Sequence, residues 1–469
     1  MNTDISINYL SRLYRLIIEE LRETCLRHAE ISHSLLELVE HVVRIHDQYW
    51  GRHQHGADIG AAEEAMLWTE YETAAVNFAN ILNARATIAT CYSSMDEYWR
   101  DAQAQANGKS SNTIWDIYEH GSRRRLEGSF AAVLNVEAAL LLNSGMSAIS
   151  VAINAVGLKP TDAVFVGKSS YFETNEVLEH FVDVIGCRIH SIDFLDIPAF
   201  ESALREFSPK LLVVETATNC PTPESLPNFS QVDFGKKWPM IICDQTIVGF
   251  PDADVSLNYP GDVVYLASLS KFVTNSISAG LIFGRASSVD RCRKIARFSG
   301  QNLQEHAFNF IRHSDITCVH YRMELHQLNV QLFMDALTQV KEELSLLRTL
   351  ERDFLGDTAN GSGVHGCLIF FALIPRQGQD YFSPELVESH RAVVCQWQMF
   401  SQRHGETFDI RSGFGWRKTS IRCYEGSQLN QSNAPSYMRI SVGLESRRAV
   451  MCLAAQLVDS IREVTHGTI

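Results

Sequence analysis

The chain has 469 residues, 45% of them hydrophobic and 20% charged, and its formal net charge is −14. An acidic chain lacks the basic surface that nonspecific nucleic-acid binding requires, so we expect no nucleic-acid partner. Eleven cysteines without a CxxC pair favour free thiols in a reducing compartment. Since no apolar stretch is long enough to cross a bilayer and no signal-peptide pattern opens the chain, we expect a cytoplasmic protein without a membrane partner.

The chain divides into three predicted regions. Residues 1–110 repeat apolar residues at three- and four-residue spacing, as in "SLLELVEHVVRIHDQYW", which predicts a helical N-terminal extension. Residues 111–315 alternate short apolar runs such as "DAVFVGKSS", "KLLVVETAT" and "VVYLASLS" with helical segments. This alternation predicts a large α/β domain with a mostly parallel sheet. Residues 316–469 open on a long helical tract that runs to Leu344, and they predict a smaller α+β domain.

Three features of the α/β region combine into one kind of site. Asp244 ends the apolar run "MIICD", and Lys271 follows the next run, between hydroxyl side chains. Upstream, Ser144-Gly145 opens a helical stretch, where free N–H groups suit a phosphate. Each feature alone has an ordinary structural explanation, as a turn, a surface residue or a helix cap. An amine, a carboxylate and a phosphate cradle together are what pyridoxal 5'-phosphate (PLP) requires.

Several longer motifs occur along the chain, among them "LEGSFAAVLNVEAALLLNSGMSAI", "YFET" and "SLSKF". They resemble those of the cystathionine γ-synthase/methionine γ-lyase family, the Cys/Met-metabolism group of fold type I PLP-dependent enzymes. "LEGSFAAVLNVEAALLLNSGMSAI" is similar to the family's "LE-x-x-x-A-x-L-E-…-SGMAAI", and "YFET" to its "Y-x-x-T". "ETATNCP", "DQT", "SLSKF" and "MRISVGLE" follow in the family's order. The resemblance implies a PLP-dependent transferase fold: a mostly parallel seven-stranded sheet with helices on both faces, and a smaller α+β C-terminal domain.

The resemblance also implies roles for individual residues. Lys271 would carry PLP as a Schiff base and move protons, Asp244 would pair with the pyridinium nitrogen, and Tyr171 would stack on the ring. The other cofactor-binding positions implied are Ser144, Gly145, Met146, Asn219, Thr246, Ser268 and Ser270. The substrate-binding positions are Arg439, for the α-carboxylate, and Ser420 and Arg422 beside it. For two of these residues a purely structural role is the alternative. Tyr171 could pack against the sheet, and Arg439 could form an ion pair with Glu445.

Two departures from the family's motifs bear on partners and substrate. The family's "Y-x-R-x-G-N-P-T", which serves the neighbouring subunit's phosphate site, is matched only in part by "IYEHGSRRRLE", where Tyr118 keeps the tyrosine. We therefore expect a homodimer or homotetramer whose cross-subunit arginine is not identified. In "SIRCYE", Arg422 replaces the glycine of the family's "S-L-G-x-x-E". A cation at that position favours a larger or more charged substrate.

The expected activity is γ-replacement or γ-elimination on a homoserine- or methionine-derived amino acid, through a vinylglycine-type intermediate, in specialised (natural-product) biosynthesis. Candidate substrates are O-acyl-homoserine, cystathionine and S-adenosylmethionine, and replacement needs a second small-molecule nucleophile. The alternative is β-elimination or β-replacement on cysteine or cystathionine. A non-catalytic family member is the third hypothesis, which the presence of both Lys271 and Asp244 disfavours.

Overall fold

A computed structural model describes fifteen stretches of the chain. They are residues 121–221, 229–235, 237–248, 259–273, 277–304, 307–308, 311, 318–349, 366–376, 380, 383–405, 408–410, 413–415, 418–424 and 436–467. The predicted N-terminal extension and Tyr118 lie outside them. One compact unit, Phe130–Gln301 with Val319–Ile469, holds both sheets of the protein. A second unit is made of Met1–Ser129 and Asn302–Cys318 and includes most of α5 (Gly121–Val133).

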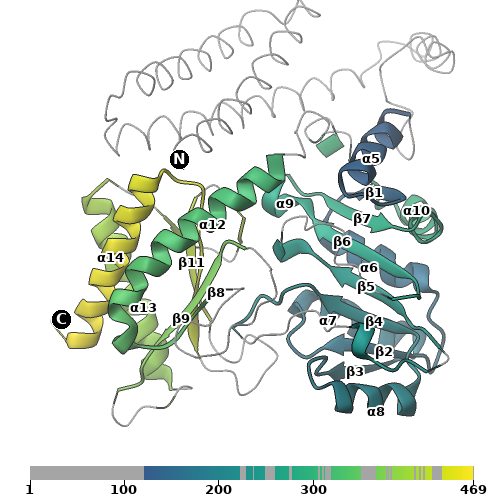
Figure 1. Cartoon of the computed structure of the whole chain (residues 1–469), viewed down its shortest axis with the longest axis horizontal. Coiled ribbons are helices and arrows are strands. Elements are labelled where there is room, and N and C mark those ends of the chain that lie inside the picture. Colours follow the sequence, from purple (N-terminus) through teal and green to yellow (C-terminus); the bar gives the residue numbers. More distant parts are fainter. Residues whose placement is uncertain are drawn as a thin grey trace, which may run out of the picture. The chain divides into compact units, whose positions relative to one another are not determined.

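The larger sheet has seven strands in the order β1-β7-β6-β5-β4-β2-β3 (Figure 1). β7 runs opposite to the other six strands, which are parallel to one another, so the predicted mostly parallel seven-stranded sheet is confirmed. The strands are β1 (Ala138–Leu142), β2 (Ala163–Gly167), β3 (Arg188–Ile192), β4 (Leu211–Glu215), β5 (Met240–Asp244), β6 (Val263–Ser268) and β7 (Gly280–Gly284).

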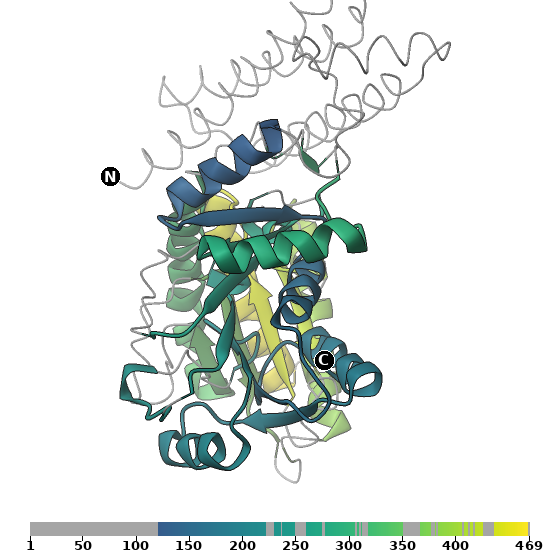
Figure 2. The same ribbon diagram turned by 90° about the vertical axis from the view of Figure 1, so that its right-hand side faces the viewer.

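Helices cover both faces of this sheet, as the family resemblance implied. On one face, α6 (Gly145–Val156), α7 (Phe172–Ile185) and α10 (Ala286–Ser299) share a buried apolar cluster with the strands. Figure 2 shows α10 running alongside β1. On the other face, α8 (Ile197–Phe207) packs Phe200 against Phe165 of β2, with ring centroids 6.3 Å apart. Alternate residues of a strand point to opposite faces, so a strand buried on both sides is apolar throughout.

The smaller sheet has five strands in the order β10-β11-β12-β9-β8. Its strands are β8 (Leu344–Thr349), β9 (Leu368–Leu373), β10 (Asp409–Ile410), β11 (Ser420–Tyr424) and β12 (Tyr437–Ser441). One face packs on α12 (Cys318–Leu337), α13 (Pro384–Arg403) and α14 (Arg447–His466) through a continuous buried core. The other face carries polar and aromatic side chains, and it contributes to the site described below.

The helical tract predicted through Leu344 is wrong at its end. The α-helix stops at Leu337, and a 3-10 segment, η4 (Thr338–Glu343), breaks the helical backbone at Val340 (φ −121°, ψ 26°). Leu344 then begins β8, where Leu344 and Leu347 are buried in the core. The charged run "KEE" looks helical in sequence, but the apolar residues that follow it are buried in the core as part of a strand.

Other sequence expectations can be checked only within the described residues. The eight cysteines whose side chains the structure describes are all free. None of the helices seen there has the length and apolar character that a bilayer crossing needs. The same residues contain no cluster of three or more histidine, cysteine or acidic side chains suited to a metal ion.

Candidate active site

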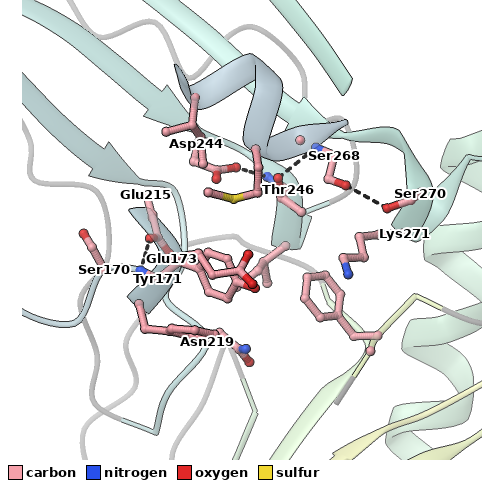
Figure 3. Close-up of a pocket in the computed structure, with 18 of the residues that line it drawn as sticks. Ser170, Tyr171, Glu173, Glu215, Asn219, Asp244, Thr246, Ser268, Ser270 and Lys271 are labelled. Atoms are coloured by element: carbon pink, nitrogen blue, oxygen red, sulfur yellow. Dashed lines mark hydrogen bonds between the residues drawn. The ribbon is translucent and has the colours of Figure 1, made fainter. Parts of the chain in front are cut away.

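A cavity of about 630 Å³ lies where strand ends of the larger sheet face the polar side of the smaller one. It brings together residues from distant parts of the sequence (Figure 3). The predicted residues that line it are Ser144, Gly145, Met146, Tyr171, Asn219, Asp244, Thr246, Ser268, Ser270, Lys271 and Arg422. Arg439 and Ser420 are buried next to the cavity and do not line it, and Tyr118 lies outside the described residues.

The start of α6 forms one end of the cavity. Ser144 caps the helix by accepting a hydrogen bond from the Ser147 N–H at 3.0 Å. The helix start lies so close to β6 and β7 that side chains are excluded there. A Cβ atom on Gly145 would lie 2.7 Å from the Ser268 Cβ, and one on Gly280 would lie 2.0 Å from the Ser144 carbonyl oxygen. These two glycines therefore permit a contact that leaves the helix N-terminus open to the cavity.

Hydroxyl groups surround that helix end. The Ser268 and Ser270 oxygens are 2.8 Å apart, and the Ser268 N–H donates to the Thr246 hydroxyl at 2.9 Å. All three residues line the cavity. Hydroxyl donors beside the positive end of a helix dipole form a site suited to a phosphate group.

Asp244 ends β5 and faces the same cavity. Its Oδ1 accepts a hydrogen bond from the Thr246 N–H at 2.8 Å. Desolvation raises the pKa of Asp244 above its usual value, while the hydrogen bonds from Thr246 lower it. Neither of these Thr246 groups is charged, so a cation bound in the cavity would stabilise the carboxylate further.

Lys271 belongs to α9 (Leu269–Phe272), and its amine points into the cavity (Figure 3). Desolvation lowers the pKa of Lys271, as does the nearby charge of Arg439, while Glu173 raises it. The amine also lies 5.1 Å from the centre of the Phe414 ring. Burial favours the neutral amine, which is the nucleophilic form that a Schiff base requires.

Tyr171 sits at the start of α7, where its N–H donates to the Glu215 carboxylate. Burial raises the pKa of Tyr171, and Glu173, which accepts a hydrogen bond from the tyrosine side chain, raises it further. The phenol is therefore protonated at neutral pH. Sequence reasoning missed Glu173, although the acidic residue within "YFET" was visible.

The five-stranded sheet supplies the opposite wall. Arg439 of β12 is 1% exposed and donates hydrogen bonds to the Asn219 Oδ1 at 2.6 Å and to the Gly413 carbonyl at 3.2 Å. The Ser420 hydroxyl is buried and, among the described residues, has no hydrogen-bond partner. Glu445, the alternative partner of Arg439, accepts hydrogen bonds from the N–H and hydroxyl of Thr419.

Sequence reasoning did not find the aromatic part of this wall. Phe414 and Tyr424 line the cavity, and Arg439 lies 5.9 Å and 5.2 Å from the centres of their rings. Gly415 follows with φ +70°, and a Cβ there would lie 2.8 Å from the Phe272 ring and 3.0 Å from the Lys271 carbonyl carbon. The segment 413–415 therefore packs directly on the helix that carries the lysine.

These residues fit PLP. The helix start and its hydroxyls suit the phosphate, the Lys271 amine suits the aldehyde, and the desolvated Asp244 carboxyl suits a protonated ring nitrogen. The three groups lie around one cavity large enough for a small cofactor and substrate.

Comparison with known proteins agrees with this chemistry. The family described as "Cys/Met metabolism PLP-dependent enzyme" matches residues 73–342. The chain is 24% identical over 296 residues to L-methionine gamma-lyase of Pseudomonas putida, covering 61% of this chain and 67% of that one. It is 26% identical over 248 residues to cystathionine beta-lyase of Neurospora crassa, covering 50% and 51%.

Solved structures show the same fold. The crystal structure of cystathionine gamma synthase from Xanthomonas oryzae pv. oryzae, in complex with aminoacrylate and cysteine, is similar with a TM-score of 0.58 and 17% identity. The similarity covers 75% of this chain and 87% of that one, which supports the fold type I assignment. Because the family model spans more than half of the chain, the protein belongs to the Cys/Met-metabolism family of PLP-dependent enzymes, and its cofactor is pyridoxal 5'-phosphate.

Proposed function

We propose that the protein is a PLP-dependent lyase or synthase that breaks or exchanges a bond at Cγ of a homoserine- or methionine-derived amino acid. The observation that carries the proposal is the convergence of Lys271, Asp244 and the α6 start on one cavity. Chemistry at Cγ is favoured because L-methionine gamma-lyase and cystathionine gamma synthase are among the similar proteins. Cystathionine beta-lyase is also among them, so β-elimination is the alternative.

Each residue has a role in this proposal. When bound, PLP withdraws electrons from the carbon atoms of an amino acid joined to it. Lys271, whose pKa burial lowers, would accept the proton that leaves Cα, pass it on, and then accept the proton that leaves Cβ, which allows the group at Cγ to depart. Asp244 would keep the ring nitrogen protonated, and Tyr171, whose pKa is raised, would stack on the ring and donate a proton to the departing group.

The remaining residues would bind and orient. The α6 start, with Ser268 and Ser270, would hold the phosphate, while Asn219 would lie near the ring hydroxyl. Arg439, which donates to the Asn219 Oδ1, would bind the substrate α-carboxylate after exchanging part of its present hydrogen bonding. Phe414 and Tyr424 would exclude water from the reacting atoms.

The variant Lys271→Ala tests the proposal. We expect it to lose the visible absorbance of bound PLP and all turnover of O-acetyl-L-homoserine, L-methionine and S-adenosylmethionine. Lys168→Ala is the matched control, since Lys168 is exposed and pairs with Asp193 at 3.6 Å. Release of a four-carbon 2-oxo acid would identify γ-elimination, and release of pyruvate from L-cysteine or L-cystathionine would identify the β-reaction. Turnover retained by Lys271→Ala would contradict both.

We also propose a homodimer or homotetramer that uses a second small-molecule nucleophile in the cytoplasm, within specialised biosynthesis. The partial match of "IYEHGSRRRLE" to the family's cross-subunit motif supports an oligomer. Light scattering coupled to size-exclusion chromatography measures the mass directly. A monomer with full activity would contradict this part of the proposal.

A further inference from the structure

One face of the β11–β12 pair carries an ordered set of polar and aromatic side chains. In the antiparallel register, Arg422 lies opposite Arg439 and Tyr424 lies opposite Tyr437. Because alternate residues point to opposite faces, these four side chains share one face of the sheet. Ile421 and Ile440 point the other way, into the buried core.

The arginines and tyrosines of this face contact one another. Tyr424 stacks on Tyr437 with ring centroids 5.0 Å apart and an interplanar angle of 12°. The guanidinium carbons of Arg422 and Arg439 lie 5.1 Å and 5.2 Å from the centre of the Tyr424 ring. Two cations therefore share one aromatic ring.

The same register row continues across the sheet. Arg439 lies opposite Phe370 of β9, and Phe370 lies opposite Arg348 of β8. Arg348 is 8% exposed and donates a hydrogen bond to the Pro221 carbonyl, next to the cavity residue Cys220. The row thus holds three arginines and one aromatic residue, and it concentrates positive charge on the side of the sheet that adjoins the cavity.

The register sets Arg422 and Arg439 directly opposite each other. Like charges directly opposite each other on neighbouring strands are destabilising. Burial lowers the pKa of the Arg439 guanidinium, Tyr424, Tyr437 and Cys367 raise it, and the charge of Arg422 also lowers it. An anion bound beside the pair would offset this repulsion, and departures from local stability rules are expected at functional sites.

Of the two paired arginines, Arg422 is the more accessible. It lines the cavity and is partly exposed, whereas Arg439 is buried and donates to Asn219 and Gly413. Within the described residues Arg422 forms no salt bridge. The acidic residues that line the cavity, Glu173, Glu215 and Asp244, belong to α7, β4 and β5 of the larger sheet's side. The field in the cavity therefore draws a carboxylate toward the β11 wall.

We propose that Arg422 is a specificity-determining residue that binds a second carboxylate of the substrate, so that the enzyme prefers a dicarboxylic amino acid to a monocarboxylic one of equal length. The inference rests on the proposed function, in which Arg439 binds the α-carboxylate. A planar guanidinium can donate two parallel hydrogen bonds to a carboxylate, and that of Arg422 lies 5.1 Å from the centre of the Tyr424 ring.

Calorimetric titration of the full-length holoenzyme with two matched probes tests the inference. L-2-aminoadipate and L-norleucine have the same number of carbon atoms, neither has a leaving group at Cγ, and only the first has a side-chain carboxylate. We expect the wild type to bind L-2-aminoadipate more tightly. We expect Arg422→Gln to weaken that binding by about tenfold to a hundredfold, as for a lost hydrogen bond between charged groups, and to leave L-norleucine binding unchanged.

Two further variants complete the design. Arg422→Lys keeps the charge without the planar fork, so we expect it to retain part of the preference. Arg403→Gln is the matched control, because Arg403 also lies over an aromatic ring, Phe400 at 6.0 Å, but on the exposed end of α13. The preference should be unchanged in Arg403→Gln.

Three results would overturn the inference. The wild type could show no preference for L-2-aminoadipate, or Arg422→Gln could keep that preference unchanged. Arg422→Gln could also weaken the binding of both probes equally, which would place Arg422 on the α-carboxylate. The absorbance of bound PLP separates these results from failure of the proposed function. A protein that takes up no PLP would contradict both proposals, and one that takes it up without the preference contradicts only this one.

Discussion

The two walls of the cavity are built by different structural means. The seven-stranded sheet supplies its residues from strand ends and helix starts: Ser144 follows β1, Asp244 closes β5 and Lys271 follows β6. The five-stranded sheet supplies its residues from one of its faces, where Arg422 and Tyr424 lie on β11 beside β12.

The difference separates two tasks. Carboxyl ends of parallel strands converge at one sheet edge, so short local motifs are enough to build the cofactor site. The face of an antiparallel pair depends instead on strand register, and a shift by one residue would move Arg422 to the buried side. We therefore expect changes in the first wall to impair chemistry or folding, and changes in the second to alter substrate choice.

The largest effect should come from Gly280→Ala, which tests whether backbone contact fixes the first wall. The new Cβ would lie 2.0 Å from the Ser144 carbonyl oxygen, so the start of α6 must move. We expect the free energy of unfolding to fall by more than about 3 kcal/mol, with loss of PLP binding, because rigid backbone cannot relax around the methyl group. Urea denaturation and PLP absorbance measure the two effects.

Gly128→Ala is the control for this prediction, and its expected effect on stability has the opposite sign. Gly128 lies within α5, and no atom lies within 4 Å of the position of an added Cβ. The substitution should raise stability by up to about 1 kcal/mol, because glycine is unfavourable inside a helix. Equal stabilities of the two variants would show that the contact at Gly280 does not constrain the site.

Asp244→Asn should give the next largest effect. The amide cannot hold a proton on the ring nitrogen, so we expect turnover to fall at least about a hundredfold, which corresponds to about 2.7 kcal/mol of transition-state stabilisation. Because the phosphate cradle is unchanged, PLP should still bind. Turnover per bound PLP is the quantity to measure. Full turnover in this variant would show that Asp244 is not needed for catalysis. It would also weaken the assignment of the chemistry to the first wall.

Glu173→Gln should shift a pH profile without abolishing activity. The Glu173 carboxylate raises the pKa of Lys271, so its removal lowers that pKa further. The amine then becomes neutral at lower pH, and the acidic limb of PLP uptake by the apoprotein should move to lower pH. The profile is read from the visible absorbance at a series of pH values.

Glu176→Gln is the control for this shift, since Glu176 is exposed on the same helix, α7. Its profile should coincide with that of the wild type. A shift to higher pH in Glu173→Gln would contradict the assigned sign.

The smallest effect concerns stability in the five-stranded sheet. Desolvation raises the pKa of Glu445 from 4.5 to about 7, against the hydrogen bonds from Thr419. A raised carboxyl pKa stabilises the folded state below the unfolded pKa, and this contribution is lost as pH rises through the folded pKa. The free energy of unfolding of the wild type should therefore fall between pH 4.5 and 7, and Glu445→Gln should not show this part of the fall. Denaturation midpoints across this range should fall less steeply with rising pH in Glu445→Gln than in the wild type and in the exposed control Asp459→Asn.

The sequence by itself determined the alternation of strands and helices along the chain that forms the larger sheet, and the main cofactor-site residues of the first wall. Asp244 and Lys271 stand out because each follows a buried apolar strand, and Ser144-Gly145 because it opens a helix. These signals are local, so one strand and its end are enough to read them.

Only the tertiary structure decided how the second wall is arranged. The strand β11 was not predicted, because "SIRCY" places an arginine and a tyrosine on the cavity side and leaves few apolar residues to mark a strand. The pairing of Arg422 with Arg439, the burial of Arg439 behind the wall, and the approach of Phe414 to Lys271 all depend on contacts between distant segments. Register and packing of this kind are fixed by the whole core, so no local pattern in the sequence contains them.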